Sequence, residues 1–253
     1  MMRTGCRRAA CIAALLVFAC SAGAGARPLE VTLAASIDAI SGQHQVGNGE
    51  ADRFSLLPLP LGEATIRAGA DTLRVEGLPP ISVPYTGGSR LQSTRLSIVN
   101  ATLRHAFAGG WFVGAGQTVY NQSTQYANPP NEVQSSRVTG LRVELGRTFG
   151  TAANRIEAFG AVNGRMHGVQ YTTYAVPGFT CAGCPPGSVT FADPENAAQV
   201  DLNARLAHRV WAHGDLLLGL RYLNYTAHYD VAPGVLADRN VGFAPTLGLR
   251  VHL

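Results

Sequence analysis

The sequence predicts an all-β chain that folds as one closed, antiparallel barrel of about ten strands, with eight or twelve strands as alternatives. Apolar residues alternate with small or polar residues along successive segments, and a strand turns such residues to opposite faces. The connections between these segments are alternately short and long. No segment beyond residue 26 approaches the roughly 20 apolar residues that a spanning helix needs. These three observations favour strands throughout.

Ten segments carry the alternation or flank a tight turn. In chain order they are 30–39, 65–68, 72–76, 99–107, 111–116, 141–145, 155–172, 200–206, 216–222 and 240–253. The second and third form a hairpin around the turn 69–71. Five prolines crowd the outer halves of this hairpin: Pro58, Pro60, Pro79, Pro80 and Pro84. Because proline cannot donate to a sheet ladder, either these strands leave the sheet early or the strand count changes.

The last segment alternates most regularly. One of its faces is wholly apolar, made of Val241, Phe243, Pro245, Leu247, Leu249, Val251 and Leu253. A final strand with one apolar and one polar face resembles the closing strand of bacterial outer-membrane β-barrels. The resemblance implies that the apolar face contacts lipid and that the polar face lines the lumen. A soluble periplasmic sandwich or lipocalin-like barrel, with its apolar face inward, is the alternative.

The connections are also typical of such transmembrane barrels, which have short periplasmic turns and longer external loops. Short connections near 69–71, 108–110, 150–154 and 212–215 alternate with mostly long, polar ones near 42–53, 121–134, 173–198 and 230–239. Aromatic residues gather at both ends of the strands, as two interfacial girdles require. They are Phe107, Trp111, Phe149 and Trp211 at the short turns, and Tyr120, Tyr171, Tyr222, Tyr225 and Tyr229 toward the long loops.

Residues 1–26 have the pattern of a signal peptide, which leaves 27–253 as the barrel domain. Arg3, Arg7 and Arg8 precede an apolar core, and small residues at 22–26 offer cleavage sites. Lipoprotein processing at Cys20 is the alternative. The expected location is therefore the outer membrane of a Gram-negative bacterium.

The charge balance excludes a basic surface for nucleic acid. All 20 basic residues are arginine, and removing the three of the leader leaves 17 against 16 acids. The formal net charge of +4 therefore comes mainly from the leader. The expected partners are outer-membrane lipids, lipopolysaccharide and the barrel-insertion machinery, and we expect a monomer.

Charged residues on the polar parity predict a narrow lumen lined by arginine and carboxylate. The interior of so small a barrel is filled by side chains, and buried charges must pair. An Arg–carboxylate ladder that stiffens the lumen is one interpretation, and an anion-selective constriction or small-ligand site is the other. The expected polar cluster is Arg142, Glu144, Glu157, Asn163, Arg165, His167, Arg205 and Arg221.

Asn163, Arg165 and His167 share a parity in the seventh strand, where a histidine beside polar groups could act as a general base. The omptin proteases need paired acids and an Asp–His pair, and the lipid A deacylases need a Ser–His arrangement. Neither motif stands at a convincing place in this sequence. We therefore assign no catalytic residue, and no phosphate loop or HExxH motif indicates a cofactor or metal.

Cys181 and Cys184 are the only cysteines after the leader. In an oxidising compartment, two close thiols in a Pro/Gly-rich segment predict a disulfide. A redox-active pair would need a helix N-terminus to activate its thiol, and zinc would need four ligands.

These observations lead to two expectations of function. The first is a non-enzymatic outer-membrane barrel, porin-like in architecture, with an envelope-structural, small-solute or ligand-binding role. The alternative is a membrane-embedded enzyme that hydrolyses lipid or peptide at the external rim of the barrel.

Overall fold

The computed structural model describes residues 29–45, 51–84, 91–126, 132–175, 187–231 and 234–253. These residues form strands and one short 3-10 turn, η1 (Ala108–Gly110). In chain order the strands are β1 (Leu29–Gln45), β2 (Ala51–Ala68), β3 (Asp71–Pro84), β4 (Leu91–Ala106), β5 (Trp111–Tyr126), β6 (Glu132–Gly150), β7 (Asn154–Ala175), β8 (Ser188–Trp211), β9 (Gly214–Val231) and β10 (Gly234–His252). The predicted count of ten strands is confirmed for this part of the chain. The predicted signal peptide, Cys181 and Cys184 lie outside the described residues.

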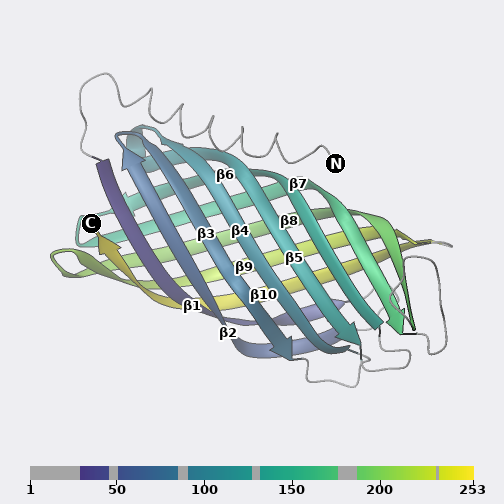
Figure 1. Cartoon of the computed structure of the whole chain (residues 1–253). Helices are drawn as coiled ribbons and strands as arrows, with labels where there is room; N and C mark the ends of the chain where they lie inside the picture. The colour runs from purple at the N-terminus through teal and green to yellow at the C-terminus, as the bar shows by residue number, and fades with distance from the viewer. Residues whose placement is uncertain (1–28, 46–50, 85–90, 127–131, 176–186, 232–233) are drawn as a thin grey trace.

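The strands close into one antiparallel barrel (Figure 1). Each strand pairs with its neighbours in sequence, and β1 pairs with β10 to complete the circle. The closing ladder runs from the pair Thr32–His252 to the pair Gln45–Arg239. Closure removes free sheet edges, which is the condition for crossing a bilayer with strands.

The two ends of the barrel differ in how the strands are joined. At one end, the turn end, short turns connect β2 to β3, β4 to β5, β6 to β7 and β8 to β9. Gly69 begins the two-residue turn between β2 and β3 with a φ of 63°, a backbone conformation that glycine adopts without strain. At the opposite end, the loop end, β7 runs to Ala175 and β8 begins at Ser188. The predicted long loops are therefore wrong in extent, because much of their polar sequence continues the strand ladders.

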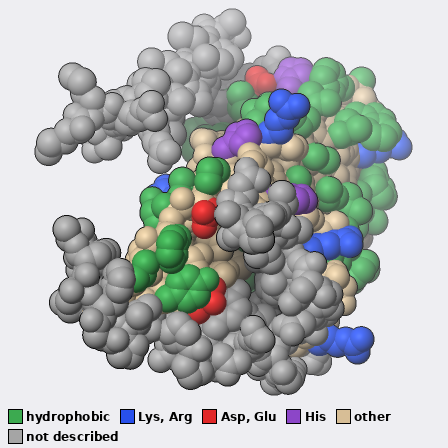
Figure 2. All heavy atoms as spheres, turned by 90° about the vertical axis from the view of Figure 1, so that its right-hand side faces the viewer, with side chains coloured by type: hydrophobic (Ala, Val, Ile, Leu, Met, Phe, Trp, Pro, Cys, Tyr) green, Lys and Arg blue, Asp and Glu red, His purple; other side chains and the backbone are tan. Residues whose placement is uncertain are grey.

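The outer wall of the barrel is apolar. Leu141, Leu220 and Phe243 are each 64–65% exposed, and alternate residues along most strands point the same way. Figure 2, which looks toward the loop end, shows hydrophobic side chains over the described flank with arginine and histidine side chains among them. An apolar surface of this extent is expected to contact lipid. In the described part of the chain, no helix has the length and apolar character to cross a membrane.

The aromatic girdle is present at the turn end and differs from the prediction at the loop end. The residues at the short turns are exposed, as predicted: Phe107, Trp111, Phe149 and Trp211. Tyr171 is also exposed, but Tyr120, Tyr225 and Tyr229 are buried inside the barrel, which corrects the second girdle. The reason is strand parity, because Tyr225 and Tyr229 share the inward parity of Arg221.

The lipid-facing assignment can be tested on β10. Leu247 is 58% exposed near the middle of the apolar band, where an outward arginine costs about 2–4 kcal/mol. We therefore expect Leu247→Arg to lower the free energy of unfolding by that amount in urea titrations of the barrel in lipid vesicles. Val251→Arg, on the same face but near the turn end, should cost only about 0–1 kcal/mol. Equal losses at both positions would contradict the assignment of the outer wall.

Candidate functional site

Arginines and carboxylates cross the lumen as one closed ring. Ten side chains alternate in charge around it, and each neighbouring pair forms a salt bridge of between 2.6 and 3.8 Å. In ring order they are Glu63, Arg205, Glu157, Arg104, Glu144, Arg142, Asp201, Arg221, Glu76 and Arg74. Asp38 joins the ring at Arg221, and Arg250 joins it at Glu63. We call these twelve residues the charge ring.

The charge ring is electrically balanced, with six arginines and six carboxylates, and it is almost wholly buried. Arg142 donates from Nε to Glu144 at 2.7 Å and from Nη2 to Asp201 at 2.9 Å. Arg221 donates to both oxygens of Asp201, at 3.0 and 2.9 Å, in the two-pronged geometry that favours arginine–carboxylate pairs. Because buried charges are stable only when paired, this balance allows so many charges inside one barrel.

Strand β5 contributes no charged residue to the charge ring. Instead, a glycine of β5 makes room for a salt bridge between its two neighbours, β4 and β6. Gly114 pairs with Arg104 on one side and Glu144 on the other. Arg104 Nε reaches Glu144 Oε2 at 2.6 Å, although the two residues belong to non-adjacent strands. A Cβ at Gly114 would lie 2.9 Å from Thr102 Cγ2 and 3.0 Å from Arg104 Cγ. The small residue on the inward parity therefore leaves the space in which Arg104 lies.

Aromatic rings cover the charge ring on its turn side. Phe112 and Phe159 are both 5% exposed and pack together with Ala161. The guanidinium of Arg104 lies 4.5 Å from the ring centre of Phe112 and 4.8 Å from that of Phe159. Arg74 lies 4.9 Å from the Phe159 ring. These cation–π contacts hold the faces of the two guanidinium groups, while the N–H groups along their edges donate to carboxylates.

Amide and hydroxyl side chains cover the charge ring on its loop side. Asn100 donates to Glu76 at 3.3 Å and accepts a hydrogen bond of 2.7 Å from Thr118. Asn163 donates to Gln199 at 2.9 Å. These uncharged polar groups cover part of the charge ring on this side, while Asp38, Glu76 and Arg221 stay in contact with the space beyond.

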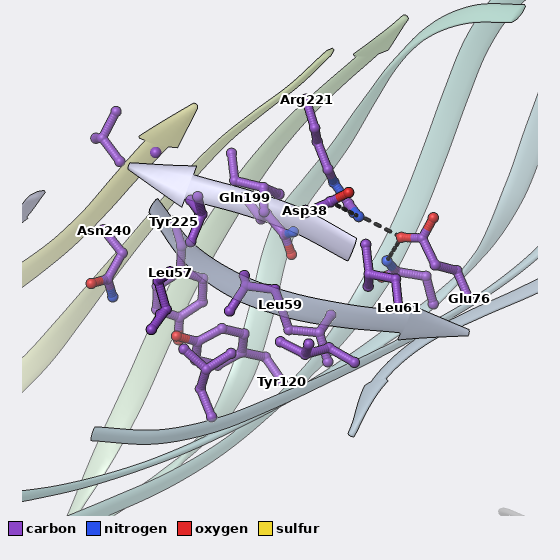
Figure 3. Close-up of a pocket in the computed structure, with 18 residues that line it drawn as sticks. Asp38, Leu57, Leu59, Leu61, Glu76, Tyr120, Gln199, Arg221, Tyr225 and Asn240 are labelled. Atoms are coloured by element: carbon purple, nitrogen blue, oxygen red, sulfur yellow. Dashed lines mark hydrogen bonds and ion pairs between the residues drawn. The ribbon is translucent and has the colours of Figure 1, made fainter. Parts of the chain in front are cut away.

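Beyond this polar layer, toward the loop end, the lumen contains a partly open, mostly apolar cavity of about 80 Å³. Its apolar walls come from β1 to β5, β9 and β10 and include Ile40, Leu57, Leu59, Leu61, Leu78, Leu96, Ile98, Tyr120, Leu223, Tyr225 and Val241. Its floor is formed by Asp38, Glu76, Asn100, Gln199 and Arg221. In Figure 3 the leucines of β2 face the two tyrosines, and the Arg221–Glu76 ion pair lies at one end. We call this space the apolar pocket.

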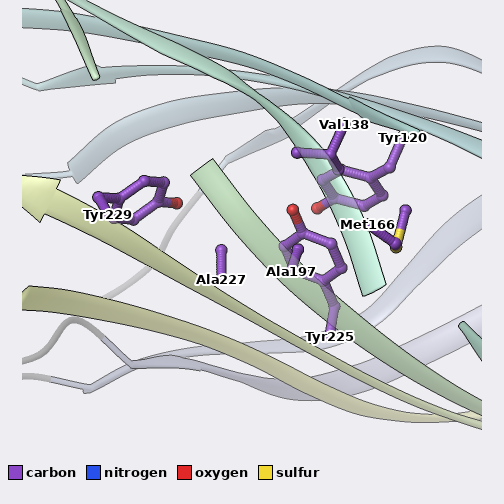
Figure 4. Packing of buried hydrophobic residues seen from close by; sticks show 7 residues of the cluster. All are labelled: Tyr120, Val138, Met166, Ala197, Tyr225, Ala227 and Tyr229. Carbon is purple, nitrogen blue, oxygen red and sulfur yellow. The ribbon is translucent and has the colours of Figure 1, made fainter. Parts of the chain in front are cut away.

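Two stacked tyrosines bound the apolar pocket on the side of β5 and β9. The rings of Tyr120 and Tyr225 are 4.1 Å apart and nearly parallel, at 16°. Figure 4 shows the pair beside Val138 and Met166, which are fully buried. The Tyr225 hydroxyl donates to Glu195 at 2.9 Å. The pocket thus has one fixed aromatic wall opposite the leucines of β2.

Of the predicted polar cluster, five residues belong to the charge ring: Arg142, Glu144, Glu157, Arg205 and Arg221. Asn163 also lies inside the barrel, in the polar layer above the ring. Asp38 is not among the predicted lumen residues, and Glu63 lies outside the predicted strands. Both residues carried a signal, because Asp38 shares the parity of Ser36 and Glu63 stands two residues before the predicted strand on the parity of Thr65.

Arg165 and His167 do not lie in the lumen, which corrects their predicted place. The register of β7 against β8 shifts between Asn163 and Met166, where β7 carries one extra residue. Such a bulge reverses the parity of everything beyond it, so Met166 is fully buried while Arg165 and His167 are exposed. On the outer surface, His167 Nδ1 lies 2.7 Å from Asn196 Oδ1.

Metal binding has no evident site in the part of the chain that the structure describes. There, no group of three or more histidine, cysteine or acidic residues is arranged to hold an ion. The predicted Cys181–Cys184 disulfide remains a prediction.

The fold is that of bacterial outer-membrane β-barrels. The chain is similar to the outer membrane protease OmpT of Escherichia coli, with a TM-score of 0.51, 11% identity, and coverage of 88% of this chain and 97% of OmpT. It also matches the β domain of the Bordetella autotransporter BrkA, with a TM-score of 0.42, 13% identity, and coverage of 87% of this chain and 98% of that domain. A third match is the P. putida toluene transporter TodX, with a TM-score of 0.35, 8% identity, and coverage of 90% of this chain and 91% of TodX. No family model and no curated protein matches the sequence. The fold and the apolar wall bear out the predicted barrel and its outer-membrane location.

Proposed function

We propose that this protein is a non-enzymatic outer-membrane barrel that binds a linear alkyl chain in the apolar pocket. The single observation that carries the proposal is an apolar cavity inside the lumen. The interior of a transmembrane barrel is ordinarily polar, filled by hydrated or paired side chains. Inward leucines around a free space therefore point to a ligand that matches them.

The small volume of the apolar pocket favours an alkyl chain over a ring. Its volume of about 80 Å³ is smaller than the ~150 Å³ apolar cavity that accepts benzene. A methylene chain is narrower than a ring and gains about 0.8 kcal/mol for each buried CH₂. The charge ring closes the lumen beneath the pocket, so the chain would bind in the outer half of the barrel.

The alternative function, an enzyme at the external rim, has less support from the positions of its candidate residues. His167 points outward and contacts Asn196, whose neutral amide cannot stabilise an imidazolium as a carboxylate would. Asp38 accepts a hydrogen bond from Thr246 inside the barrel and lies 3.6 Å from Arg221.

The proposal is tested with cis-parinaric acid, a linear fatty acid whose fluorescence rises in apolar surroundings. The purified barrel in detergent should bind this probe saturably. Ile98→Trp should fill part of the apolar pocket and displace about two methylene groups, a loss of about 1.6 kcal/mol or about 15-fold in affinity.

Val99→Trp is the matched control, because Val99 is the next residue of β4 and faces outward at 43% exposure. It should leave the affinity unchanged. Absence of saturable binding by the unaltered barrel, or equal weakening by both substitutions, would refute the proposed function.

A further inference from the structure

The wall of the apolar pocket contains a seam without backbone hydrogen bonds. The ladder between β2 and β3 runs from the pair Ala68–Asp71 to the pair Gly62–Gly77 and ends there within the described residues. Both strands nevertheless continue toward the loop end. Over this stretch β2 stays paired with β1 as far as Ala51, and β3 stays paired with β4 as far as Pro84. We call the facing stretches, residues 57–61 of β2 and 78–82 of β3, the β2–β3 seam.

Prolines explain why the ladder stops. Pro58 and Pro60 pair with Ala39 and Ile37 of β1. Because proline has no N–H, these must be non-hydrogen-bonded pairs, and the backbone groups of Pro58 and Pro60 then face β3 instead. The edge of β2 toward β3 therefore lacks two donors in succession.

On the other side of the seam, Pro79 and Pro80 occupy a bulge of β3. The register against β4 shifts between Leu78 and Ile81, and the two prolines fall in that gap. They too offer no N–H to β2. The sequence predicts that these strands leave the sheet early or that the strand count changes; instead, both strands stay in the ten-stranded sheet through β1 and β4, and only their mutual ladder ends early.

Side chains alone close the seam. Leu59 of β2 and Leu78 of β3 belong to one buried cluster, with Leu57, Leu61 and Ile81 packed against it. All four prolines of the seam are exposed on its outer side, which faces the bilayer. The same leucines, Leu59 and Leu78, line the apolar pocket. One layer of leucine side chains therefore separates the pocket from lipid.

We propose that the β2–β3 seam is a lateral passage by which an alkyl chain moves between the apolar pocket and the outer leaflet of the membrane. This inference rests on the proposed function, because it assigns a route to the ligand of the same pocket. Separating β2 from β3 along the seam breaks no backbone hydrogen bond. It breaks only apolar contacts between side chains, and acyl chains of the bilayer can replace these contacts. Elsewhere around the barrel, the described strand pairs are joined by ladders along most of their length. The alkyl chain can belong to a bilayer lipid or to a free fatty acid dissolved in the bilayer.

The experiment combines a fluorescent reporter in the pocket with a reversible staple across the seam. Tyr120→Trp serves as the reporter, after Trp111 and Trp211 are replaced with phenylalanine. Leu61→Cys with Leu78→Cys forms the staple, one step beyond the last ladder pair, after Cys181 and Cys184 are replaced with serine. Ala64→Cys with Val75→Cys is the matched control, because these residues are already paired in the same hairpin.

In vesicles of phosphatidylcholine with brominated acyl chains, a lipid chain that enters the pocket quenches the reporter. We expect quenching in the reduced protein, its loss when the seam cysteines are oxidised, and its return on reduction. Oxidation of the control pair should change nothing. If the natural source is a free fatty acid, the staple should instead block uptake of cis-parinaric acid from the vesicle bilayer.

The inference is overturned if neither quenching nor uptake responds to the seam staple. Binding of cis-parinaric acid in detergent would then still support the proposed function and would place the entrance at the loop end. If the probe does not bind in detergent, the proposed function fails independently. A band that shifts on boiling in denaturing gels verifies that each variant has folded as a closed barrel.

Discussion

Replacing Arg142 with methionine should destabilise the barrel by about 3–5 kcal/mol, because it removes one partner from a buried ion-pair network. Arg142 is fully buried and is bonded to both Glu144 and Asp201. Its loss leaves the charge ring with an excess negative charge in a medium that cannot solvate it. The measurement is the free energy of unfolding of the barrel in lipid vesicles, from urea titration monitored by tryptophan fluorescence.

Two further variants separate charge pairing from general damage to the strand. Arg137→Met lies on the same strand at an exposed position and should change the stability little. The double variant Arg142→Met/Glu144→Gln restores the balance of charges and should recover part of the lost stability. If Arg142→Met is no more harmful than Arg137→Met, the buried network does not contribute as the structure implies.

Removing an opposite pair of charges should turn a closed barrel into a conducting one. In planar bilayers we expect the unaltered protein to show no ion channels, because side chains fill a lumen of this size and the charge ring crosses it. Arg142→Ala with Asp201→Ala deletes a balanced pair from the centre of the ring and should produce discrete channels. Large, stable conductance by the unaltered protein would contradict a closed lumen.

Arg165→Ala is the control for conductance. The predicted lumen cluster includes Arg165, whereas the structure places this residue on the outer surface. We now expect Arg165→Ala to leave conductance unchanged. One interpretation of the sequence is an anion-selective constriction, but the charge ring contains six arginines and six carboxylates. The net charge of the ring therefore gives no support to a preference for anions.

Alternation of residues predicted the barrel, its strand count and most of its lumen. It succeeded for Arg142, Glu144 and Arg221 because each lies in a strand whose period of two is unbroken up to that residue. It failed beyond residue 163, where one extra residue in β7 reversed the faces of Arg165 and His167. A bulge is a local backbone event, and nothing in the pattern of polar and apolar residues around it is distinctive.

The apolar pocket was missed for a different reason. Its leucines on β2 lie among Pro58 and Pro60, and proline argues against a strand when the sequence is considered alone. The structure resolves this conflict, because the backbone nitrogen of each proline, which has no hydrogen to donate, faces β3, and β2 forms no ladder with β3 there. Prolines at alternate positions prevent a strand from pairing with two neighbours, but they allow it to pair with one neighbour, as β2 pairs with β1.

The charge ring also limits when the interior of the barrel can lose its water. Its bonds from Arg205 to Glu63 and from Arg221 to Glu76 join residues that are 142 and 145 positions apart in the chain. Until β8 and β9 are in place, the carboxylates of β2 and β3 have only Arg74 between them and must stay hydrated. The interior can therefore exclude water only after strands distant in the sequence have met and the barrel has closed.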